Sequence, residues 1–360
     1  MKEDMKKMLE ERNDRIIRAI IDKSKSICPK SIAFIGIYGS FYTGDIHEKS
    51  DLDLCIVIND DDGWKLSSCF ILDDVAFDIY CTPWNVLEDM AEYKNPYISK
   101  LLDLNIVYVN DREYLKKYEE LKLKAINKLS AEFSSDDNEN AQKLVFEGIK
   151  EYANLMLSEE YGECRYKMAG MLYYIEQAIY MYNKSYITRG VKRIPEELAT
   201  MSNLPVDFNE NYNNLIKSQN IEEIKDLSTK LMKSVKIFSK KMKERVNVKN
   251  EITENDIRGS YEEIYSNWKN KMYHAVDINS YYLSLMTAAS CQEFYDDMYN
   301  NYNIEKADIM KNLKDNDLKS AAESFDKAMD DYKRNYENLN INVVKYKDLD
   351  EFEKNYLLLD

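Results

Sequence analysis

Two apolar runs that flank a Gly-Ser pair constrain the fold of this chain more than any other feature. Residues 31–38 and 51–58 are rich in apolar and β-branched side chains, which is typical of buried strands. Between them stands the polar segment GSFYTGDIHEKS, and the second run opens with two aspartates separated by one leucine. A tight polar turn and an acidic pair between two buried strands indicate a site at one end of a sheet.

Further strand and helix patterns surround this pair. Residues 75–80 and 105–110 alternate like strands, whereas the N-terminus, residues 84–92 and residues 112–129 have helical spacing. Beyond residue 130 the pattern is helical almost to the end, where we expect a short strand and a helix. The sequence therefore predicts an α+β fold, in which a small mixed sheet is followed by all-helical bundle regions.

Two polar, turn-rich stretches mark the expected domain boundaries. They are residues 130–141 and residues 247–260. We accordingly expect a first domain over 1–130, a helical domain over 141–248, and an additional helical region of unassigned role over 255–360.

The acidic pair and the turn predict a site for a cation and an anion together. In a strand, Asp51 and Asp53 share one face, where two carboxylates repel unless a cation lies between them. Oxygen ligands of this kind suit Mg²⁺, which completes its shell with water and phosphate oxygens. Gly39 allows a sharp turn, after which backbone amides and the Ser40 hydroxyl can face a phosphate. Asp78, on the polar side of the strand over 75–80, supplies a third acid.

Neither half of this pattern is specific by itself, because acidic pairs begin or end many strands and Gly-Ser pairs are common. The full order is much narrower. It runs from a strand to Gly-Ser, across ten residues to an Asp-x-Asp strand, and on to a strand with an inward carboxylate.

The composition is acidic and gives further limits. The formal net charge is −15 and the pI is about 4.9, which argues against a nucleic-acid partner and favours cationic partners or solubility alone. Six scattered cysteines without a Cys-x-x-Cys pair suit buried thiols in a reducing cytoplasm. No apolar run is long enough for a membrane span, and the charged N-terminal segment lacks the apolar region of a signal peptide. We therefore expect a cytoplasmic protein with no membrane partner.

The segment IGIYGSFYTGDIHEKSDLDLCIV resembles the polymerase-β-like nucleotidyltransferase superfamily and is most similar to kanamycin nucleotidyltransferase and related aminoglycoside-modifying enzymes. The likeness covers roughly residues 30 to 225. It implies that a nucleoside monophosphate moves from ATP or another nucleoside triphosphate to a hydroxyl, with release of pyrophosphate. It also implies two Mg²⁺ ions held by Asp51, Asp53 and Asp78, in a catalytic domain that is followed by a substrate-binding helical domain.

The resemblance also implies a general base. Glu151, in FEGIKEYANL, falls where the family places this residue. On a helix, Glu147 and Glu151 form an acidic ridge beside an apolar stripe, and most such ridges are simply solvated. The sequence thus leaves both interpretations of Glu151 open, and the resemblance favours catalysis.

Two positions depart from the family pattern. Relatives often carry Arg or Lys three residues after the serine, where it can meet the phosphates, and Thr43 stands there in this chain. We expect Gly39, Ser40, Thr43 and Lys49 to line the nucleotide site, with Lys49 or a lysine of the helical region as the replacement cation. The family's lysine four residues beyond the base is Leu155 here.

The expected function is a magnesium-dependent transfer to a small hydroxylated and cationic acceptor, an aminoglycoside. One alternative is a nucleotidyltransferase that modifies a protein or a transfer RNA, as in toxin–antitoxin systems. Another is a non-catalytic nucleotide-binding relative, which the intact aspartates argue against. The resemblance further implies a homodimer in which each cleft is completed by the helical domain of the partner.

Overall fold

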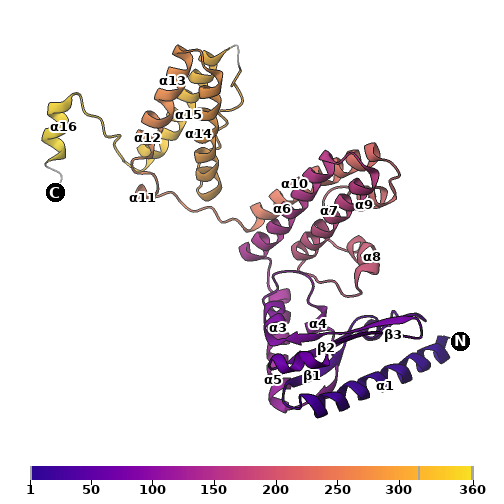
Figure 1. Cartoon of the computed structure of the whole chain (residues 1–360). Helices are drawn as coiled ribbons and strands as arrows, with labels where there is room; N and C mark the ends of the chain where they lie inside the picture. Colours follow the sequence, from indigo (N-terminus) through magenta and orange to yellow (C-terminus); the bar gives the residue numbers. More distant parts are fainter. Residues whose placement is uncertain (1, 315–316, 358–360) are drawn as a thin grey trace. The chain divides into compact units, whose positions relative to one another are not determined.

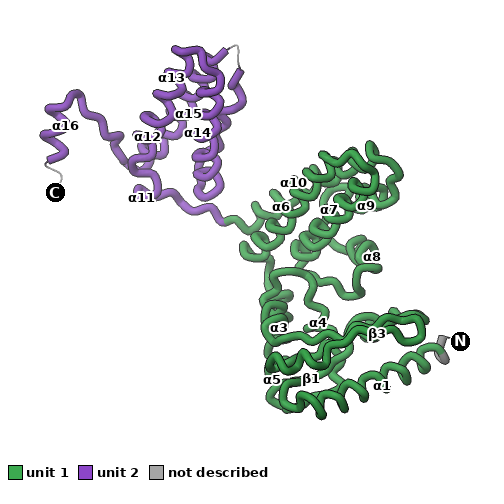
Figure 2. Tube along the Cα trace, viewed as in Figure 1, with its two compact units in different colours: residues 1–247 green, residues 248–360 purple. Residues whose placement is uncertain are grey.

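The computed structural model describes residues 2–314 and 317–357. The chain divides into two compact units, residues 1–247 and residues 248–360 (Figure 1, Figure 2). Each unit has hydrophobic core clusters of its own. The finer division of the first unit into two domains stays a prediction.

The first unit contains the predicted small mixed sheet. Its strand order is β5-β2-β1-β6, with β1 (Ile32–Ile37) antiparallel both to β2 (Leu54–Ile58) and to β6 (Asn105–Val109). The short strand β5 (Cys81–Pro83) runs parallel to β2. Two apolar residues of α1 (Lys2–Ile27), Ile17 and Ile20, pack in the same core cluster as one face of the sheet.

Side chains of β2 alternate between the two faces of the sheet as the sequence predicts. Leu54, Ile56 and Ile58 belong to the core cluster of α1, whereas Cys55 and Val57 belong to the cluster of the helices on the opposite face. The strand itself is shorter than the sequence predicts, because it begins at Leu54 and not at Asp51. In the described structure the pairing of β1 with β2 ends at Ile37 and Leu54, before the turn at Gly39, and does not include Asp51 or Leu52.

A separate two-stranded sheet carries the third expected aspartate. It consists of β3 (Ser68–Leu72) and β4 (Val75–Ile79), which pair antiparallel. The sequence predicts β4 but misses β3, since every residue of β3 is exposed and the strand lacks alternation. The remaining elements around the sheets are α2 (Ser40–Thr43), η1 (Asp61–Leu66), α3 (Trp84–Ala91), α4 (Ser99–Leu102) and α5 (Arg112–Ser130).

A helical bundle completes the first unit. It consists of α6 (Ser135–Leu157), α7 (Tyr161–Tyr182), η2 (Val191–Arg193), α8 (Ile194–Ala199), α9 (Phe208–Lys217) and α10 (Ile221–Val246). Helices α6 and α7 pack as an antiparallel pair, and α10 packs against both of them and against α9 (Figure 1). The stretch 130–141, expected to be turn-rich, is mostly helix α6. Ser134 and Asp137 form a capping box that begins this helix.

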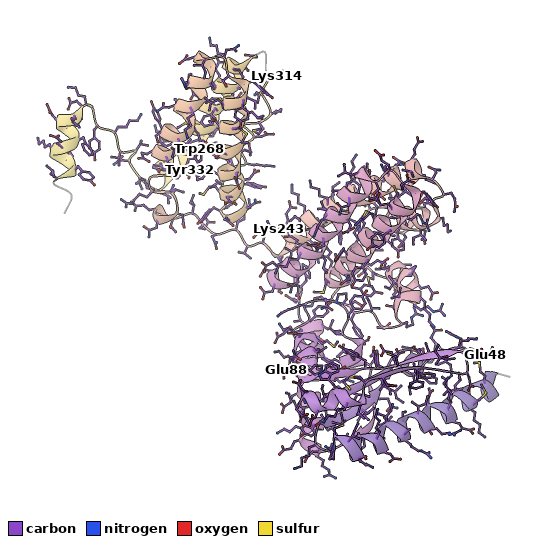
Figure 3. The ribbon with its side chains drawn as sticks, in the orientation of Figure 1. Glu48, Glu88, Lys243, Trp268, Lys314 and Tyr332 are labelled. Atoms are coloured by element: carbon purple, nitrogen blue, oxygen red, sulfur yellow. The ribbon has the colours of Figure 1, made fainter. Side chains whose placement is uncertain are left out.

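The second unit is mainly helical in its described part. It contains α11 (Glu254–Ile257), α12 (Ser260–Glu263), the π-helical η3 (Ile264–Lys269), α13 (Asn270–Asp277), α14 (Tyr281–Asn301), α15 (Leu318–Asn338) and α16 (Leu349–Tyr356). Its core is aromatic: Phe294 packs against both Trp268 and Tyr332, which are labelled in Figure 3. The expected C-terminal helix is present as α16, but the residues described before it form no strand.

The described helices and the cysteines bear on two further expectations, the absence of a membrane span and the presence of free thiols. None of the described helices combines the length and the apolar character that a membrane crossing requires. All six cysteines are free thiols, and Cys69 is the exposed one.

Candidate active site

The Gly-Ser turn leaves the end of the central strand in a conformation that favours glycine. Gly39 has φ 69° and ψ −141°, and it precedes the single helical turn α2. The turn is closed by Thr43, whose backbone N–H and Oγ1 both donate to the Gly39 carbonyl, at 3.1 and 3.2 Å. The Thr43 hydroxyl is thereby used within the turn. Gly44 ends the turn with φ 74°.

Asp53 lies directly on this turn. A methyl group at residue 39 would come within 1.9 Å of Asp53 Oδ2, so the carboxylate occupies the space that a side chain at Gly39 would fill. The Ser40 backbone N–H donates a hydrogen bond to that carboxylate. The Tyr38 N–H also donates to the Asp53 carbonyl, at 3.1 Å. The turn and the acidic pair, which ten residues separate in sequence, therefore form one local structure.

The surroundings of Asp53 disfavour the charged form of its carboxyl group. Burial raises the pKa of its carboxyl above the ordinary value, and the neighbouring charge of Asp51 raises it further. Asp51 itself is exposed. The pKa of Tyr38 is also raised, first by burial and then by the charges of all three aspartates, including Asp78. Negative charge thus converges around the Tyr38 hydroxyl.

Asp78 reaches this region from the separate hairpin. It lies on the exposed side of β4, and the Cys69 thiol of β3 donates to its Oδ1 over 3.3 Å. In the part of the chain that is described, no three His, Cys, Asp or Glu side chains are grouped closely enough to hold a metal ion. Among the described residues the three expected carboxylates therefore do not form such a group, and their joint role stays a prediction.

An arginine that the sequence did not single out stands beside the acidic pair. Arg12 of α1 donates from Nη2 to the Ser50 carbonyl at 2.6 Å, and its guanidinium lies over the Phe77 ring. Burial lowers the pKa of Arg12, while the charges of Asp51 and Asp73 act in the opposite direction. Arg12 thus fixes the chain immediately before Asp51.

Lys49, the expected replacement cation, is exposed. Its backbone N–H donates to His47 Nδ1, and its side chain lines an open cavity of about 830 Å³ together with Arg12 and Arg15. This cavity lies between α1 and the turn that joins β3 to β4 (residues 72–75).

The loop after the turn is tied to the helical bundle. Asp45 accepts two hydrogen bonds from Arg193, from Nε at 2.9 Å and from Nη2 at 3.0 Å. Lys192 Nζ lies 3.2 Å from Asp45 Oδ2 and donates to the Asp45 carbonyl at 2.9 Å. These hydrogen bonds from Arg193 and Lys192 hold the pKa of Asp45 well below its usual range.

Glu151, the expected base, lies on α6 and forms an ion pair with Lys167 of α7. Its Oε2 is 3.3 Å from Lys167 Nζ, and only 20% of the Glu151 side chain is exposed. The carboxylate also packs against Gly170. Within the described residues, no hydrogen bond or ion pair connects Glu151 with the three aspartates.

A second carboxylate of the bundle is hydrogen-bonded to a neutral side chain. Glu176 of α7 accepts a hydrogen bond from the Tyr212 hydroxyl of α9 at 2.5 Å. Burial raises its pKa to about 7. Close by, Tyr97 of the loop before α4 stacks on Tyr173 of α7 with a ring distance of 6.0 Å, so this part of the bundle contacts the sheet domain.

A lysine that the sequence also missed lies near Asp53. Lys100 of α4 has its Nζ 5.2 Å from the centre of the Tyr38 ring and donates to Thr82 Oγ1 at 3.5 Å. Its charge lowers the pKa of Asp53 and thereby opposes the effect of burial. No local motif marks this residue, because it comes from a segment far from the turn.

Comparison with known proteins bears on the part of the chain that holds the turn and the aspartates. A family model described as the nucleotidyltransferase domain matches residues 15–137, about a third of the chain. No curated protein matches the chain. The match does not single out the kanamycin enzymes, so that part of the resemblance stays a prediction. Residues 15–137, with the Gly-Ser turn, Asp51, Asp53 and Asp78, are therefore similar to a nucleotidyltransferase domain, the kind of domain that transfers nucleoside monophosphates.

Proposed function

We propose that this protein transfers a nucleoside monophosphate from ATP, or another nucleoside triphosphate, to a hydroxyl of a small polycationic acceptor and releases pyrophosphate. The observation that carries the proposal is the contact between Asp53 and the Gly39–Ser40 turn. It brings a carboxylate and the amides of a tight turn to one place, which is what a phosphate chain with a bound cation requires.

Asp51 and Asp53 fit a magnesium ion. They offer oxygen ligands two positions apart in the chain, and the pKa of Asp53 is raised by burial and by the charge of Asp51, a repulsion that a cation between the two carboxylates would relieve. The ion would shield the charge of the triphosphate. Asp78 is proposed as the third acid, although the described residues do not group it with the other two.

Glu151 is proposed as the general base that takes the proton of the acceptor hydroxyl. Its ion pair with Lys167 fixes the direction of the carboxylate. A base must lie within hydrogen-bond reach of the proton it removes, either directly or through one water molecule. The resemblance described above implies that the helical domain of a partner completes each cleft, and we therefore further propose a homodimer in which the helical part of one copy faces the sheet domain of the other.

The net charge supports the proposed acceptor class. With a formal net charge of −15, the electrostatic field of the protein favours the approach of polycations over that of nucleic acid. Aminoglycosides combine several ammonium groups with several hydroxyls, and we propose this class as the acceptor.

The reaction is tested by mass spectrometry after incubation with Mg²⁺, ATP and a panel of aminoglycosides. We expect an adduct of one nucleoside monophosphate on at least one compound and none with the Asp53→Asn variant. Absence of any adduct would remove the aminoglycoside assignment. Incubation of α-labelled ATP with cell extract then locates the acceptor, and label on a protein or transfer RNA would replace the acceptor class while keeping the reaction.

The dimer is tested by complementation. Asp53→Asn and Glu151→Gln are each expected to lose most of the activity, to about a hundredth of the parent or less. Co-expressed copies should regain about a quarter of the parental activity if one site draws on both chains of a symmetric dimer. Light scattering that shows a fully active monomer would contradict this assembly.

A further inference from the structure

A triphosphate brings several negative charges to a site that is itself acidic. The position from which related enzymes supply a cation is Thr43 here, and its hydroxyl is used inside the turn. Some other cation must lie close to Asp53 if the proposed function holds. The structure narrows the choice to one side chain.

Lys100 has unused hydrogen-bonding capacity. An ammonium group has three N–H donors. Lys100 Nζ has one hydrogen bond within the described chain, a long one of 3.5 Å to Thr82 Oγ1. No described carboxylate lies within ion-pair distance of it, and its side chain is partly buried. A partly buried cation without an anionic partner carries a desolvation cost that an arriving anion would offset.

The surroundings of Lys100 place it on the sheet face of the acidic pair. Thr82 lies on β5 opposite Val57 of β2, and the hydroxyl of Thr82 also bonds Cys55. Cys55 stands one step further along the same face from Asp53. The Lys100 charge acts on both Asp53 and Cys55, and its ammonium stands over the ring of Tyr38, the residue just before the turn.

The other nearby cations are already occupied or exposed. Arg12 donates to the Ser50 carbonyl. Lys192 and Arg193 are both bound to Asp45. Lys49 is exposed on an open cavity.

We propose that Lys100 is the residue that binds the triphosphate of a nucleotide held at the Gly39–Ser40 turn. The inference rests on the proposed function, because it needs a nucleotide in this site. Lys100 then donates its free N–H groups to non-bridging phosphate oxygens, in place of the basic residue that Thr43 replaces.

The test compares nucleotide binding by calorimetry in the full chain. Lys100→Met keeps the length and the apolar stem over Tyr38 and removes the charge. Lys94→Met is the matched control, because Lys94 is an exposed lysine of the preceding loop without a described ion pair. With Mg²⁺ present, we expect Lys100→Met to weaken ATP binding about tenfold to a hundredfold. Binding of adenosine, which lacks phosphates, should change little, and Lys94→Met should bind ATP like the parent.

Each contrary outcome has a distinct meaning. A parent protein that does not bind ATP overturns the proposed function and this inference with it. A parent that binds ATP while Lys100→Met binds it equally well overturns only the role of Lys100. Equal weakening of ATP and adenosine binding also overturns it, since Lys100 would then only maintain the fold. Lys100→Gln, which keeps a donor for Thr82, and Lys100→Arg, which should retain most of the affinity, serve if the Met variant does not fold.

Discussion

The carboxylate of Asp53 rests against Gly39 so closely that a methyl group at residue 39 would lie 1.9 Å from Oδ2. The glycine therefore has two functions in the turn. It permits a φ of 69°, and it leaves the space in which the carboxylate receives the Ser40 amide. Any side chain at residue 39 changes both the turn and the position of the acid.

Replacement of this glycine separates the two functions. Gly39→Ala should destabilise the protein by more than 1 to 2 kcal/mol, roughly the cost of a left-handed alanine, because Asp53 must also move. Gly44→Ala is the control, since Gly44 has φ 74° but no atom lies within 4 Å of the added methyl group. Thermal unfolding measures stability, and ATP titration measures the site. Equal losses of stability for both variants, with nucleotide binding intact in both, would show that the position of Asp53 does not depend on Gly39.

Neutralising Asp53 should separate activity from stability. Asp53→Asn keeps an acceptor for the Ser40 amide and is expected to lower nucleotidyl transfer by about a thousandfold or more. Without divalent cations the variant should unfold at a higher temperature than the parent at pH 7. The sign follows from the pKa of Asp53, which is raised by burial and by Asp51, so the charged form is disfavoured in the folded state. The difference should shrink as the pH falls and the parental carboxyl takes up its proton. A variant that melts lower than the parent at pH 7, or that turns over within tenfold of it, contradicts the assignment.

Glu151 and Glu147 form a matched pair on α6. Glu151 is largely buried beside Lys167, whereas Glu147 is more exposed and pairs with Lys150. Glu151→Gln should lower turnover by about 10²- to 10⁴-fold, the usual contribution of a general base, with little change in ATP affinity. Glu147→Gln should have a much smaller effect. Steady-state kinetics and ATP titration decide, and similar losses for both variants would remove the base assignment.

Glu176 should make the stability of the bundle depend on pH. Its pKa is raised from 4.5 to about 7 by burial, so the folded state holds a proton that the unfolded state releases. The contribution of this bound proton to the free energy of unfolding is fully present below pH 4.5, and it is lost as the pH rises through about 7. The loss should reach about 3 kcal/mol at most. Glu176→Gln, which still accepts from Tyr212, should remove this part of the decline. Urea unfolding at pH 5 and pH 8 tests it, and an identical pH dependence in parent and variant would contradict the buried, protonated state.

The parts of the fold that the sequence predicts are those with strong local patterns. The apolar alternation of Leu54, Ile56 and Ile58 gives both the strand and its buried face. The hairpin strand β3 and the three-residue strand β5 lack such alternation, and the sequence does not predict them. The expected boundary at 130–141 also does not predict the start of α6, although the Ser-x-x-Asp capping box of this helix is present in the sequence.

In the candidate site, too, the sequence predicts only the residues that share a local pattern. Gly39, Asp51 and Asp53 are close in sequence, and one motif identifies them together. The contact of Lys100 with Tyr38 joins segments with no local motif in common, and Arg193 meets Asp45 across 148 positions. Contacts of this kind depend on how helices and sheet pack, which residue spacing does not encode.

The pairing of Asp45 with Arg193 has a consequence for the order of events in a reaction cycle. Asp45 belongs to the loop that leaves the Gly-Ser turn, and Arg193 precedes α8 in the bundle. If a nucleotide at the turn shifts this loop, it strains or relaxes the ion pair and so changes the free energy of the bundle. Thermodynamic linkage makes the effect reciprocal, so an acceptor that binds the bundle would then alter nucleotide affinity by the same factor. The two substrates would then bind cooperatively, and the pair of Asp45 and Arg193 would couple their sites.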